Sequence, residues 1–473
     1  MKKLLKGNEA IAEAAIQAGC RFFFGYPITP QNQIPEYMSK RMPQVGGCFL
    51  QAESEVAAIN MVYGAAGAGG RVMTSSSSPG ISLKQEGISY IVGAELPCVI
   101  VNMVRGGPGL GSIQPAQSDY YQATRGGGHG DYRMCVLAPS SVQEAVTLTQ
   151  EAFDIADRYR NPVMVLGDGL IGQMMEPVDM DEASNRKPAA DLKPKTWAAT
   201  GHVPTADSPR AVINSLYIDP QAMETHCQHL QAKYDAIEAA ECRWQEEMVE
   251  DAEIVLVAYG TTSRIARSAM RKCREQGVRV GLIRPITLWP FPEAAIRATL
   301  STAKKYLCVE MSMGQMIDDV RLAVNGERPV EFYGRTGGMV PTVKELVDRI
   351  MGMAQTSGFA GQVTTTSPYG RDVSHCGYPV RVSEMLSTLN GPAYIERVSV
   401  HDVPHIKKAK AAIKKAFQLQ MEGKGFTLVE VLSTCPTNWG KTPKEAFEWL
   451  KSDMLPTYPL GVYKDITTEG GQA

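Results

Sequence analysis

The sequence predicts an α/β protein built on a doubly wound parallel sheet, followed by a second, smaller α/β domain. Short apolar runs alternate with Ala-rich stretches over residues 1–180, and a similar alternation starts again at Ala252. Such alternation is typical of a parallel sheet with helices on both faces. With 473 residues, 44% of them hydrophobic, the chain can bury several cores, and we expect about three domains.

Short apolar runs mark the strands of the first predicted domain, residues 1–180. These runs are residues 22–24, 49–51, 72–74, 98–101, 135–137 and 162–166. Helical stretches separate them, and the clearest is the Ala-rich segment 56–68. The carboxyl ends of the strands meet at one edge of such a sheet, which is where open α/β sheets bind ligands.

Two short polar segments end predicted strands of this domain and carry the candidate site. In segment 25–30 (GYPITP), glycine and two prolines stop an apolar run, so the chain turns and presents Thr29. In segment 51–58 (QAESEVAA), Glu55 opens the predicted helix, and its carboxylate lies near the positive helix end. A carboxylate in that position can bind a basic ring nitrogen. An ordinary turn and a helix cap are the simpler alternatives.

Residues 181–250 are predicted to form a linker and a helical strut. Residues 181–215 are polar and contain several prolines, whereas residues 219–250 have the pattern of one long charged helix.

The second doubly wound domain is predicted over residues 251–352. Its strands are expected at 254–258, 278–283 and 306–310, with one helix from Ser263 and another through 294–300. We expect this domain to serve contacts between subunits and to close the site from outside.

A Gly-rich segment, 334–338 (GRTGG), precedes a helix predicted to begin at Thr342. It is interpreted as a turn, and binding of a phosphate-bearing anion is the less favoured alternative.

Composition and charge argue against several classes of protein. A net charge of −2 gives no reason to expect nucleic acid or an anionic membrane as a partner. No apolar run is long enough to span a bilayer, and Asn8, Glu9 and Glu13 interrupt any signal-peptide core, so a cytoplasmic location is expected. The ten cysteines are scattered without a Cys-x-x-Cys pair, so neither disulfides nor a complete iron–sulfur or zinc site is predicted.

Four segments resemble, in order and spacing, the α-type subunit of the 2-oxoacid:ferredoxin oxidoreductases. They are 25–30 (GYPITP), 51–58 (QAESEVAA), 74–80 (TSSSSPG) and 102–108 (NMVRGGP). The resemblance covers residues 1 to about 352 and is strongest to the branched-chain, or 2-oxoisovalerate, members. It implies a thiamine-diphosphate enzyme with a pyrimidine-binding-type domain at 1–180 and a transketolase carboxy-terminal-like domain at 251–352.

The resemblance implies roles for three residues. The Glu55 carboxylate would bond the cofactor's pyrimidine ring nitrogen, so that the cofactor can remove its own proton. Thr29 would contribute to the cofactor and substrate sites, and Arg105 would bind the carboxylate of a 2-oxo acid. Glu53 is the competitor for Glu55, and a surface arginine after a strand is the alternative interpretation of Arg105.

The implied reaction converts a 2-oxo acid and coenzyme A to acyl-CoA and carbon dioxide, with electrons passing to ferredoxin. The implied partners are a β-type subunit, γ-type and ferredoxin-like subunits, ferredoxin and coenzyme A.

The tail, residues 353–473, resembles the carboxy-terminal half of the family's β subunit. The likeness is carried by 361–370 (GQVTTTSPYG), 377–379 (GYP) and 425–439 (GFTLVEVLSTCPTNW). The β subunit's amino-terminal half, with its Cys-x-x-Cys pair and magnesium loop, has no counterpart. The one Gly-Asp-Gly lies at 167–169, in the first domain.

Magnesium and the [4Fe–4S] cluster are therefore expected in partner chains. Cys435 matches a single iron–sulfur ligand position and is interpreted as a lone thiol. Whether the tail is a fused remnant, a docking module or the product of a deletion stays open.

Few residues of the sequence indicate which acyl chain the site accepts. Four residues suggest room for an aliphatic side chain: Ile81, Leu110, Ile113 and Gln114. No second basic residue is obvious near Arg105, which favours branched-chain acids. Arg125 and His129 would favour 2-oxoglutarate if they faced the pocket, and a pyruvate-specific member is a further alternative.

Two other functions stay open. An NAD-linked dehydrogenase component is disfavoured, because no Gly-x-Gly-x-x-Gly follows a strand and no lipoyl-domain pattern is present. A non-catalytic assembly subunit is possible because the magnesium–diphosphate half is missing.

Overall fold

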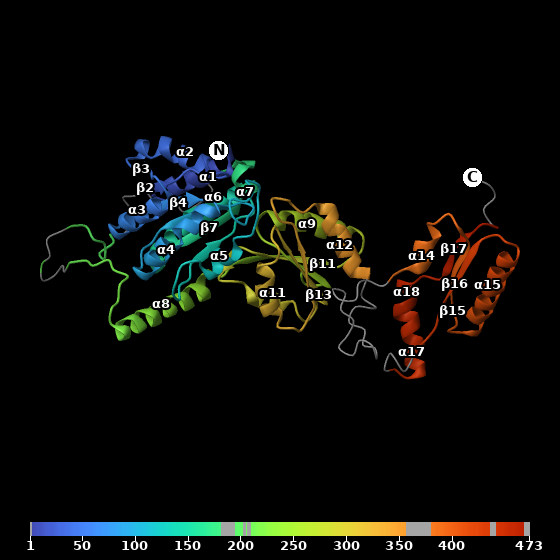
Figure 1. Ribbon diagram of the computed structural model, residues 1–473. Coiled ribbons are helices and arrows are strands. Elements are labelled where there is room, and N and C mark those ends of the chain that lie inside the picture. Colours follow the sequence, from blue (N-terminus) through green and yellow to red (C-terminus); the bar gives the residue numbers. More distant parts are fainter. Residues whose placement is uncertain are drawn as a thin grey trace. The chain divides into compact units, whose positions relative to one another are not determined.

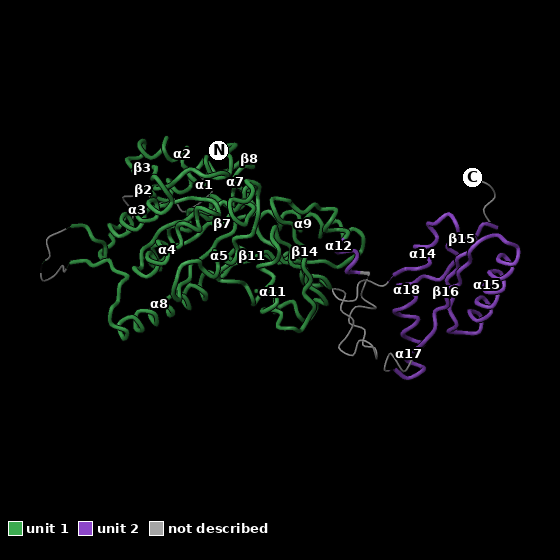
Figure 2. Tube along the Cα trace, in the orientation of Figure 1, with its two compact units in different colours: residues 1–348 green, residues 349–473 purple. Residues whose placement is uncertain are grey.

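The computed structural model describes residues 2–180, 194–201, 205, 210–355, 380–435 and 441–467. The chain forms two compact units, residues 1–348 and residues 349–473 (Figure 2). Among the described residues, no helix has both the length and the apolar character that crossing a membrane requires.

A seven-stranded sheet organises the first half of unit 1 (Figure 1). The strand order is β12-β6-β7-β5-β4-β2-β3, and neighbours are parallel except for β12 and β6. The strands are β2 (Phe22–Gly25), β3 (Cys48–Gln51), β4 (Val72–Ser76), β5 (Val99–Val104), β6 (Cys135–Leu137), β7 (Val163–Asp168) and β12 (Thr287–Trp289). Every residue of β4, β5 and β7 is buried, so both faces of the sheet are covered. The predicted doubly wound α/β class is confirmed.

Helices connect these strands and pack in groups. They are α1 (Gly7–Gln17), α2 (Gln33–Arg41), α3 (Glu55–Gly67), α4 (Pro79–Gly93), α5 (Tyr120–Arg125), α6 (Val142–Tyr159) and α7 (Gly169–Gln173), with a short 3-10 turn at Pro43–Val45. α1 packs on α2 and α6, whereas α3 packs on α4. Beside α1, β1 (Lys3–Lys6) pairs antiparallel with β8 (Met175–Val178).

The sheet has a topological switch between β2 and β4. The chain runs from β2 outward to the edge strand β3, whereas β4 is followed by β5 on its opposite side. Connections that diverge in this way leave a crevice at the carboxyl ends of the two strands. This crevice is the first place to look for a ligand site.

A five-stranded sheet organises the second half of unit 1, in the order β14-β13-β10-β11-β9, with β9 antiparallel to β11. Its strands are β9 (Trp244–Glu247), β10 (Ile254–Val257), β11 (Val280–Pro285), β13 (Lys305–Glu310) and β14 (Val330–Gly334). The helices of this region are α8 (Pro220–Glu241), α9 (Gly260–Glu275), α10 (Glu293–Ala298), α11 (Met316–Val324) and α12 (Val343–Gln355).

The prediction of one helix over residues 219–250 is wrong. α8 ends at Glu241, and β9 follows as an edge strand of the second sheet. Between them the Arg243 backbone N–H donates to Thr287 Oγ1 at 2.8 Å, so the chain leaves the helix to pair with a distant segment. β12, the strand that contains Thr287, pairs with β6 and so extends the first sheet.

Unit 2 contains a three-stranded sheet in the order β16-β15-β17. The central strand β15 (Pro392–Ser399) is parallel to β16 (Phe426–Leu432) and antiparallel to β17 (Gly461–Asp465). α15 (Val403–Met421) packs on β15 and β16. The other helical elements are α14 (Val382–Ser387), α17 (Pro443–Trp449), η4 (Leu450–Met454) and α18 (Leu455–Thr457).

Segments 361–370, 377–379 and 436–439, which carry part of the resemblance to a β subunit, lie outside the described residues.

Candidate active site

The loops at the carboxyl ends of four adjacent strands bring the candidate residues to the crevice at the topological switch. Thr29 lies in the loop after β2, Glu55 is the first residue of α3 after β3, and Arg105 directly follows β5. Segment 76–80, which ends β4 and opens α4, lies between them in the order of the strands.

Glu55 is a buried carboxylate without a hydrogen-bond partner. The cap of α3 is already made, because Ser54 Oγ accepts a hydrogen bond from the Ala57 N–H at 3.2 Å. Glu55 is 5% exposed, and no group of the described residues donates a hydrogen bond to its carboxylate. Burial of an ionised carboxylate without a donor is costly, so Glu55 fits a donor from a bound molecule.

Segment 76–80 leaves space beside Glu55 and lines it with hydroxyl groups. A Cβ atom at Gly80 would lie 2.5 Å from Glu55 Oε1 and 2.0 Å from Ser76 Oγ, so only glycine fits there. The hydroxyls of Ser76 and Ser77 are buried and have no partner among the described residues. Buried polar atoms are normally paired, so these two hydroxyls also indicate a ligand in the crevice.

Ser78 holds a backbone conformation that residues with a side chain rarely adopt, with φ 22° and ψ −78°. Its N–H donates to Asn102 Oδ1 at 3.2 Å, and its Oγ accepts from the Arg105 N–H at 3.1 Å. Strained residues of this kind cluster at binding and catalytic sites, where neighbouring contacts hold them.

Arg105 is buried, with 7% of its surface exposed, so its interpretation as a surface arginine is wrong. Its Nη1 donates to the Thr29 carbonyl at 2.9 Å, and its Nη2 donates to the Leu110 carbonyl at 2.9 Å. Its Nε is buried without a partner among the described residues. A guanidinium has five N–H donors, so the two bonds hold the group in place and leave Nε and further hydrogens for a ligand.

Lys84 is a fully buried cation that sequence reasoning missed. It lies one turn after Gly80 on the same face of α4, and its Nζ donates to Thr74 Oγ1 at 2.5 Å and to the Ser75 carbonyl at 3.2 Å. Burial lowers the pKa of Lys84 to about 7, and the charge of Glu55 opposes this shift. A lysine in a helix is usually at the surface, so the sequence carried no signal for this one.

The residues expected to form an aliphatic pocket differ strongly in exposure. Ile81 is fully buried, whereas Leu110 is 82% exposed and Ile113 is 58% exposed. Arg125 and His129, the candidates for a second basic residue in the pocket, contact other residues. Arg125 Nη2 pairs with Asp319 Oδ1 at 3.0 Å, and the ring of His129 has an edge contact with Tyr90.

The Gly-rich segment 334–338 is a turn, as predicted. Arg335 pairs with Glu345, and Thr342 caps α12 by accepting a hydrogen bond from the Glu345 N–H at 3.2 Å. A Cβ atom at Gly338 would lie 2.3 Å from Gln114 Cβ, so this turn packs closely against the loop that follows Arg105.

The Gly-Asp-Gly segment at 167–169 caps a helix. Asp168 Oδ1 accepts hydrogen bonds from the Leu170 N–H and from Thr261 Oγ1, both at 2.9 Å. Burial raises the pKa of Asp168, and the hydrogen bond from Thr261 opposes that shift. The carboxylate therefore links β7 to α9 of the second sheet.

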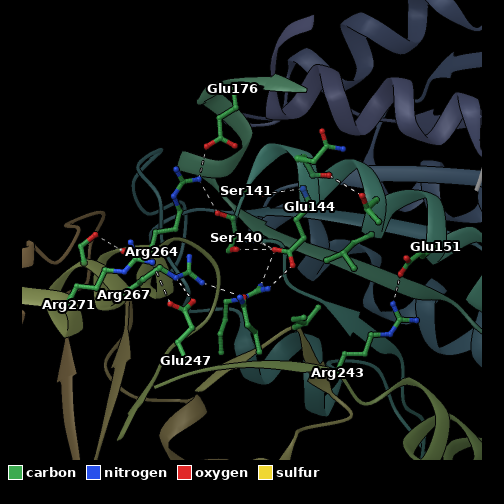
Figure 3. A pocket seen from close by; sticks show the side chains of 17 residues that line it. Ser140, Ser141, Glu144, Glu151, Glu176, Arg243, Glu247, Arg264, Arg267 and Arg271 are labelled. Carbon is green, nitrogen blue, oxygen red and sulfur yellow. Dashed lines mark hydrogen bonds and ion pairs between the residues drawn. The ribbon is translucent and has the colours of Figure 1, made fainter. Parts of the chain in front are cut away.

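A cleft of about 940 Å³ lies between α6 and α9, and none of Thr29, Glu55 and Arg105 lines it (Figure 3). Each arginine in its lining has a glutamate partner. The pairs are Arg243–Glu151, Arg264–Glu176, Arg267–Glu247, Arg271–Glu247 and Arg284–Glu144. Because these charges satisfy one another, the cleft is interpreted as an ion-paired contact between the two halves of unit 1.

Cys435 follows β16 in unit 2 and is a free thiol. Within the described ranges, nine cysteines are free, and no cysteine belongs to a group of three or more potential metal ligands.

Comparison with known proteins shows which family this chain resembles. The thiamine-diphosphate-binding part of pyruvate flavodoxin/ferredoxin oxidoreductase matches residues 13–248, and core domain II of pyruvate:ferredoxin oxidoreductase matches residues 252–346. Ketoisovalerate oxidoreductase subunit VorB of Methanothermobacter thermautotrophicus is 51% identical over 356 residues, which are 75% of this chain and 99% of that protein. Subunit VorA of the ketoisovalerate oxidoreductase of Methanothermobacter marburgensis is 38% identical over 159 residues, which are 32% of this chain and 30% of that protein.

A solved structure is also similar. It is a 2-oxoglutarate:ferredoxin oxidoreductase from Magnetococcus marinus with 2-oxoglutarate, coenzyme A and succinyl-CoA bound. The identity is 28% and the TM-score 0.63, over 74% of this chain and 65% of that chain.

Proposed function

The chain belongs to the 2-oxoacid:ferredoxin oxidoreductase family, and we propose that it supplies the pyrimidine side of the thiamine diphosphate site in a branched-chain 2-oxo acid oxidoreductase. The reaction joins coenzyme A to the acyl group left when the 2-oxo acid loses carbon dioxide, and the electrons pass to ferredoxin. The proposal is carried by buried Glu55 at the topological switch, whose carboxylate accepts no hydrogen bond from the part of the chain that the structure describes.

The residues around Glu55 fit the cofactor. When bound, thiamine diphosphate supplies the carbon nucleophile and the electron sink for decarboxylation. Glu55 holds a proton at a ring nitrogen of the pyrimidine through a charge-assisted hydrogen bond, which the low dielectric of the buried site strengthens. Gly80 keeps Glu55 Oε1 accessible, and the free hydroxyls of Ser76 and Ser77 supply further polar contacts.

Arg105 and Thr29 orient the 2-oxo acid. The bond from Arg105 to the Thr29 carbonyl joins the loops that follow two strands, so the guanidinium is held against the backbone of Thr29. The free N–H groups of Arg105 suit a carboxylate, and the Thr29 hydroxyl suits the neighbouring oxo oxygen. We infer that the same hydroxyl also contacts the cofactor.

A branched-chain acid is favoured over 2-oxoglutarate by one feature of the site and one comparison. Arg125, which could have bound a distal carboxylate, pairs with Asp319. The ketoisovalerate subunit VorB is 51% identical over nearly its whole length, against 40% for the 2-oxoglutarate synthase subunit KorA of the same organism.

The complete enzyme is a complex. A β-type chain holds the diphosphate through magnesium and carries a [4Fe–4S] cluster, and γ-type and ferredoxin-like chains complete the path to ferredoxin. We infer that residues 353–473 derive from such a β-type chain, because segments 361–370, 377–379 and 425–439 resemble its carboxy-terminal half. Cys435 then matches one cluster-ligand position and is interpreted as a lone thiol, because no described cysteine lies with it in a group of metal ligands.

The assembled complex, tested with a viologen acceptor and coenzyme A, would reveal the substrate. We expect the ratio kcat/KM to be highest for 2-oxoisovalerate and its branched homologues, and at least about tenfold lower for 2-oxoglutarate and pyruvate. A preference for 2-oxoglutarate would contradict the proposed specificity, and activity with none of these acids would contradict the proposed function.

A further inference from the structure

Unit 2 contains a compact cluster of metal-ligating side chains at the junction of β15 and α15. His401, Asp402 and His405 each offer a ligand atom, and these atoms lie within 4.8 Å of one another. It is the one group of three or more histidine, cysteine or carboxylate ligands among the described residues. The proposed reaction gives these three residues no role.

The local fold explains why these side chains meet. Asp402 caps α15, and its Oδ1 accepts a hydrogen bond from the His405 N–H at 2.8 Å, which brings the two residues together on the first turn. The ring nitrogen Nδ1 of His405 lies 2.6 Å from the same oxygen. His401 precedes the cap, and its Nε2 lies 3.3 Å from Asp402 Oδ2.

A buried hydroxyl orients His401. Ser399 Oγ lies 2.7 Å from His401 Nδ1 and is fully buried, so Nε2 is the nitrogen that faces Asp402. Histidines that bind metals usually have such a polar partner on the second ring nitrogen, which fixes the orientation of the ring. Since Ser399 is inaccessible, a role as a nucleophile in a Ser-His-Asp arrangement is excluded.

The spacing and charge of the cluster suit a divalent transition metal. Two ligands bound about 2.0–2.1 Å from a tetrahedral ion are roughly 3.4 Å apart. The observed 3.3 Å between His401 Nε2 and Asp402 Oδ2 agrees with that spacing. Two imidazoles and one carboxylate are ligand types that such ions accept.

We propose that His401, Asp402 and His405 form a binding site for a divalent transition-metal ion of the zinc class, with remaining positions open to solvent or to a ligand from a partner. Two imidazole nitrogens select such an ion over magnesium or calcium, which prefer oxygen ligands. The ion ties the residue before α15 to its first turn, so its binding stabilises the start of that helix. The nearby Lys451 lowers the affinity by repulsion but does not occupy the ligand positions.

Calorimetry with the full-length chain, stripped of metal by a chelator, tests the site. We expect one equivalent of Zn²⁺ to bind in the wild type. The affinity should fall roughly tenfold or more in His401→Ala and in His405→Gln, and Mg²⁺ should not compete. Asp402 is left unchanged because it caps α15. His229→Ala is the matched control, since His229 is an exposed histidine beside another histidine, His226, on α8 of unit 1.

The spectrum of bound Co²⁺ separates this site from adventitious binding to the cysteines. Tetrahedral visible bands without a thiolate charge-transfer band, lost in His405→Gln and kept in His229→Ala, would support the proposal. Equal metal affinity in wild type, His401→Ala and His405→Gln, or binding that follows the thiolate band, would overturn it. Circular dichroism of the metal-free variants verifies that each one is folded.

Discussion

Glu55 is the residue on which the proposed chemistry depends most directly, because it is buried and its carboxylate has no donor among the described residues. In Glu55→Gln the shape is kept and the charge is lost. We expect the complex to assemble with turnover lowered by about a hundredfold or more, the scale of a lost acid–base partner. Steady-state kinetics of the assembled complex measure this. Glu53→Gln is the control, since Glu53 is exposed two residues away, and near-normal turnover of Glu55→Gln would refute the assignment.

Arg105 is expected to act on the substrate more than on the cofactor. Lysine in its place keeps the charge but lacks the planar fork that donates to the carbonyls of Thr29 and Leu110 while presenting further N–H groups to a carboxylate. Arg105→Lys should therefore raise the KM for the 2-oxo acid about tenfold and change thiamine diphosphate affinity less. Kinetics and cofactor titration on the same preparation test this, with Arg125→Lys as control. Equal losses in both quantities would indicate a general structural role.

Because Lys84 is buried, we expect the free energy of unfolding to depend on pH. Its pKa is about 7 in the folded chain, against an ordinary value of 10.5. Between these two values the unfolded chain holds more protons, so the contribution of Lys84 to stability rises with pH across that window. Urea titrations of the wild type and Lys84→Met at pH 7 and near pH 10 measure the two unfolding free energies. We expect the wild-type value to rise relative to that of Lys84→Met between pH 7 and pH 10. A constant difference would show that Lys84 is not buried as a titrating group.

At the scale of the element, the start of α4 determines whether Glu55 is accessible. A Cβ atom at Gly80 would collide with Ser76 Oγ and Glu55 Oε1. Gly80→Ala should therefore lower thiamine diphosphate affinity in the assembled complex by roughly tenfold or more, because the helix start or the carboxylate must move. Cofactor titration measures this.

Gly64→Ala is the matched control on the neighbouring helix α3, where an added Cβ atom meets no atom within 4 Å. It should leave cofactor affinity unchanged and stabilise the chain by up to about 1 kcal/mol. Similar effects of the two alanines on affinity would contradict the close-contact argument.

Sequence patterns located the buried strands of unit 1 well, because a strand that is covered on both faces is a continuous apolar run. The run at 72–74 is part of β4, and the run at 98–101 overlaps β5. β9 and β12 were missed because neither is a long apolar run. β9 carries the polar sequence Trp244–Glu247, and β12 has three residues, so their pairing depends on partners far away in the chain.

For the whole molecule, the missing magnesium loop leads to a prediction about the isolated chain. Glu55 can contact one end of thiamine diphosphate, whereas the diphosphate needs oxygen ligands around magnesium that we infer lie in a β-type chain. The 473-residue chain alone should bind the cofactor at least about a hundredfold more weakly than the complex and should not oxidise 2-oxo acids.

The isolated chain should also be colourless, because Cys435 is a single potential ligand for an iron–sulfur cluster. Calorimetry with magnesium and cofactor, beside a visible spectrum of anaerobically purified protein, tests both parts. Activity should appear after addition of complete β-type and ferredoxin-like chains. Tight cofactor binding or an iron–sulfur spectrum of the lone chain would show that residues 353–473 form a working module.

The sequence by itself determined the α/β class, the family and the strand ends at which Thr29, Glu55 and Arg105 lie. Local patterns suffice for the class and the strand ends, since apolar periodicity reports burial, and glycine and proline report turns. The family followed from the resemblance of four short segments to a known family. The tertiary structure decided which polar groups are already paired. It showed that Arg105 bonds the Thr29 carbonyl, that Arg125 pairs with Asp319, and that no described residue donates to Glu55.

The burial of Lys84 and the meeting of His401, Asp402 and His405 were also decided by the tertiary structure. Burial and pairing depend on residues that are distant along the chain or turned toward one another by a helix cap. A single sequence without its fold does not contain those contacts.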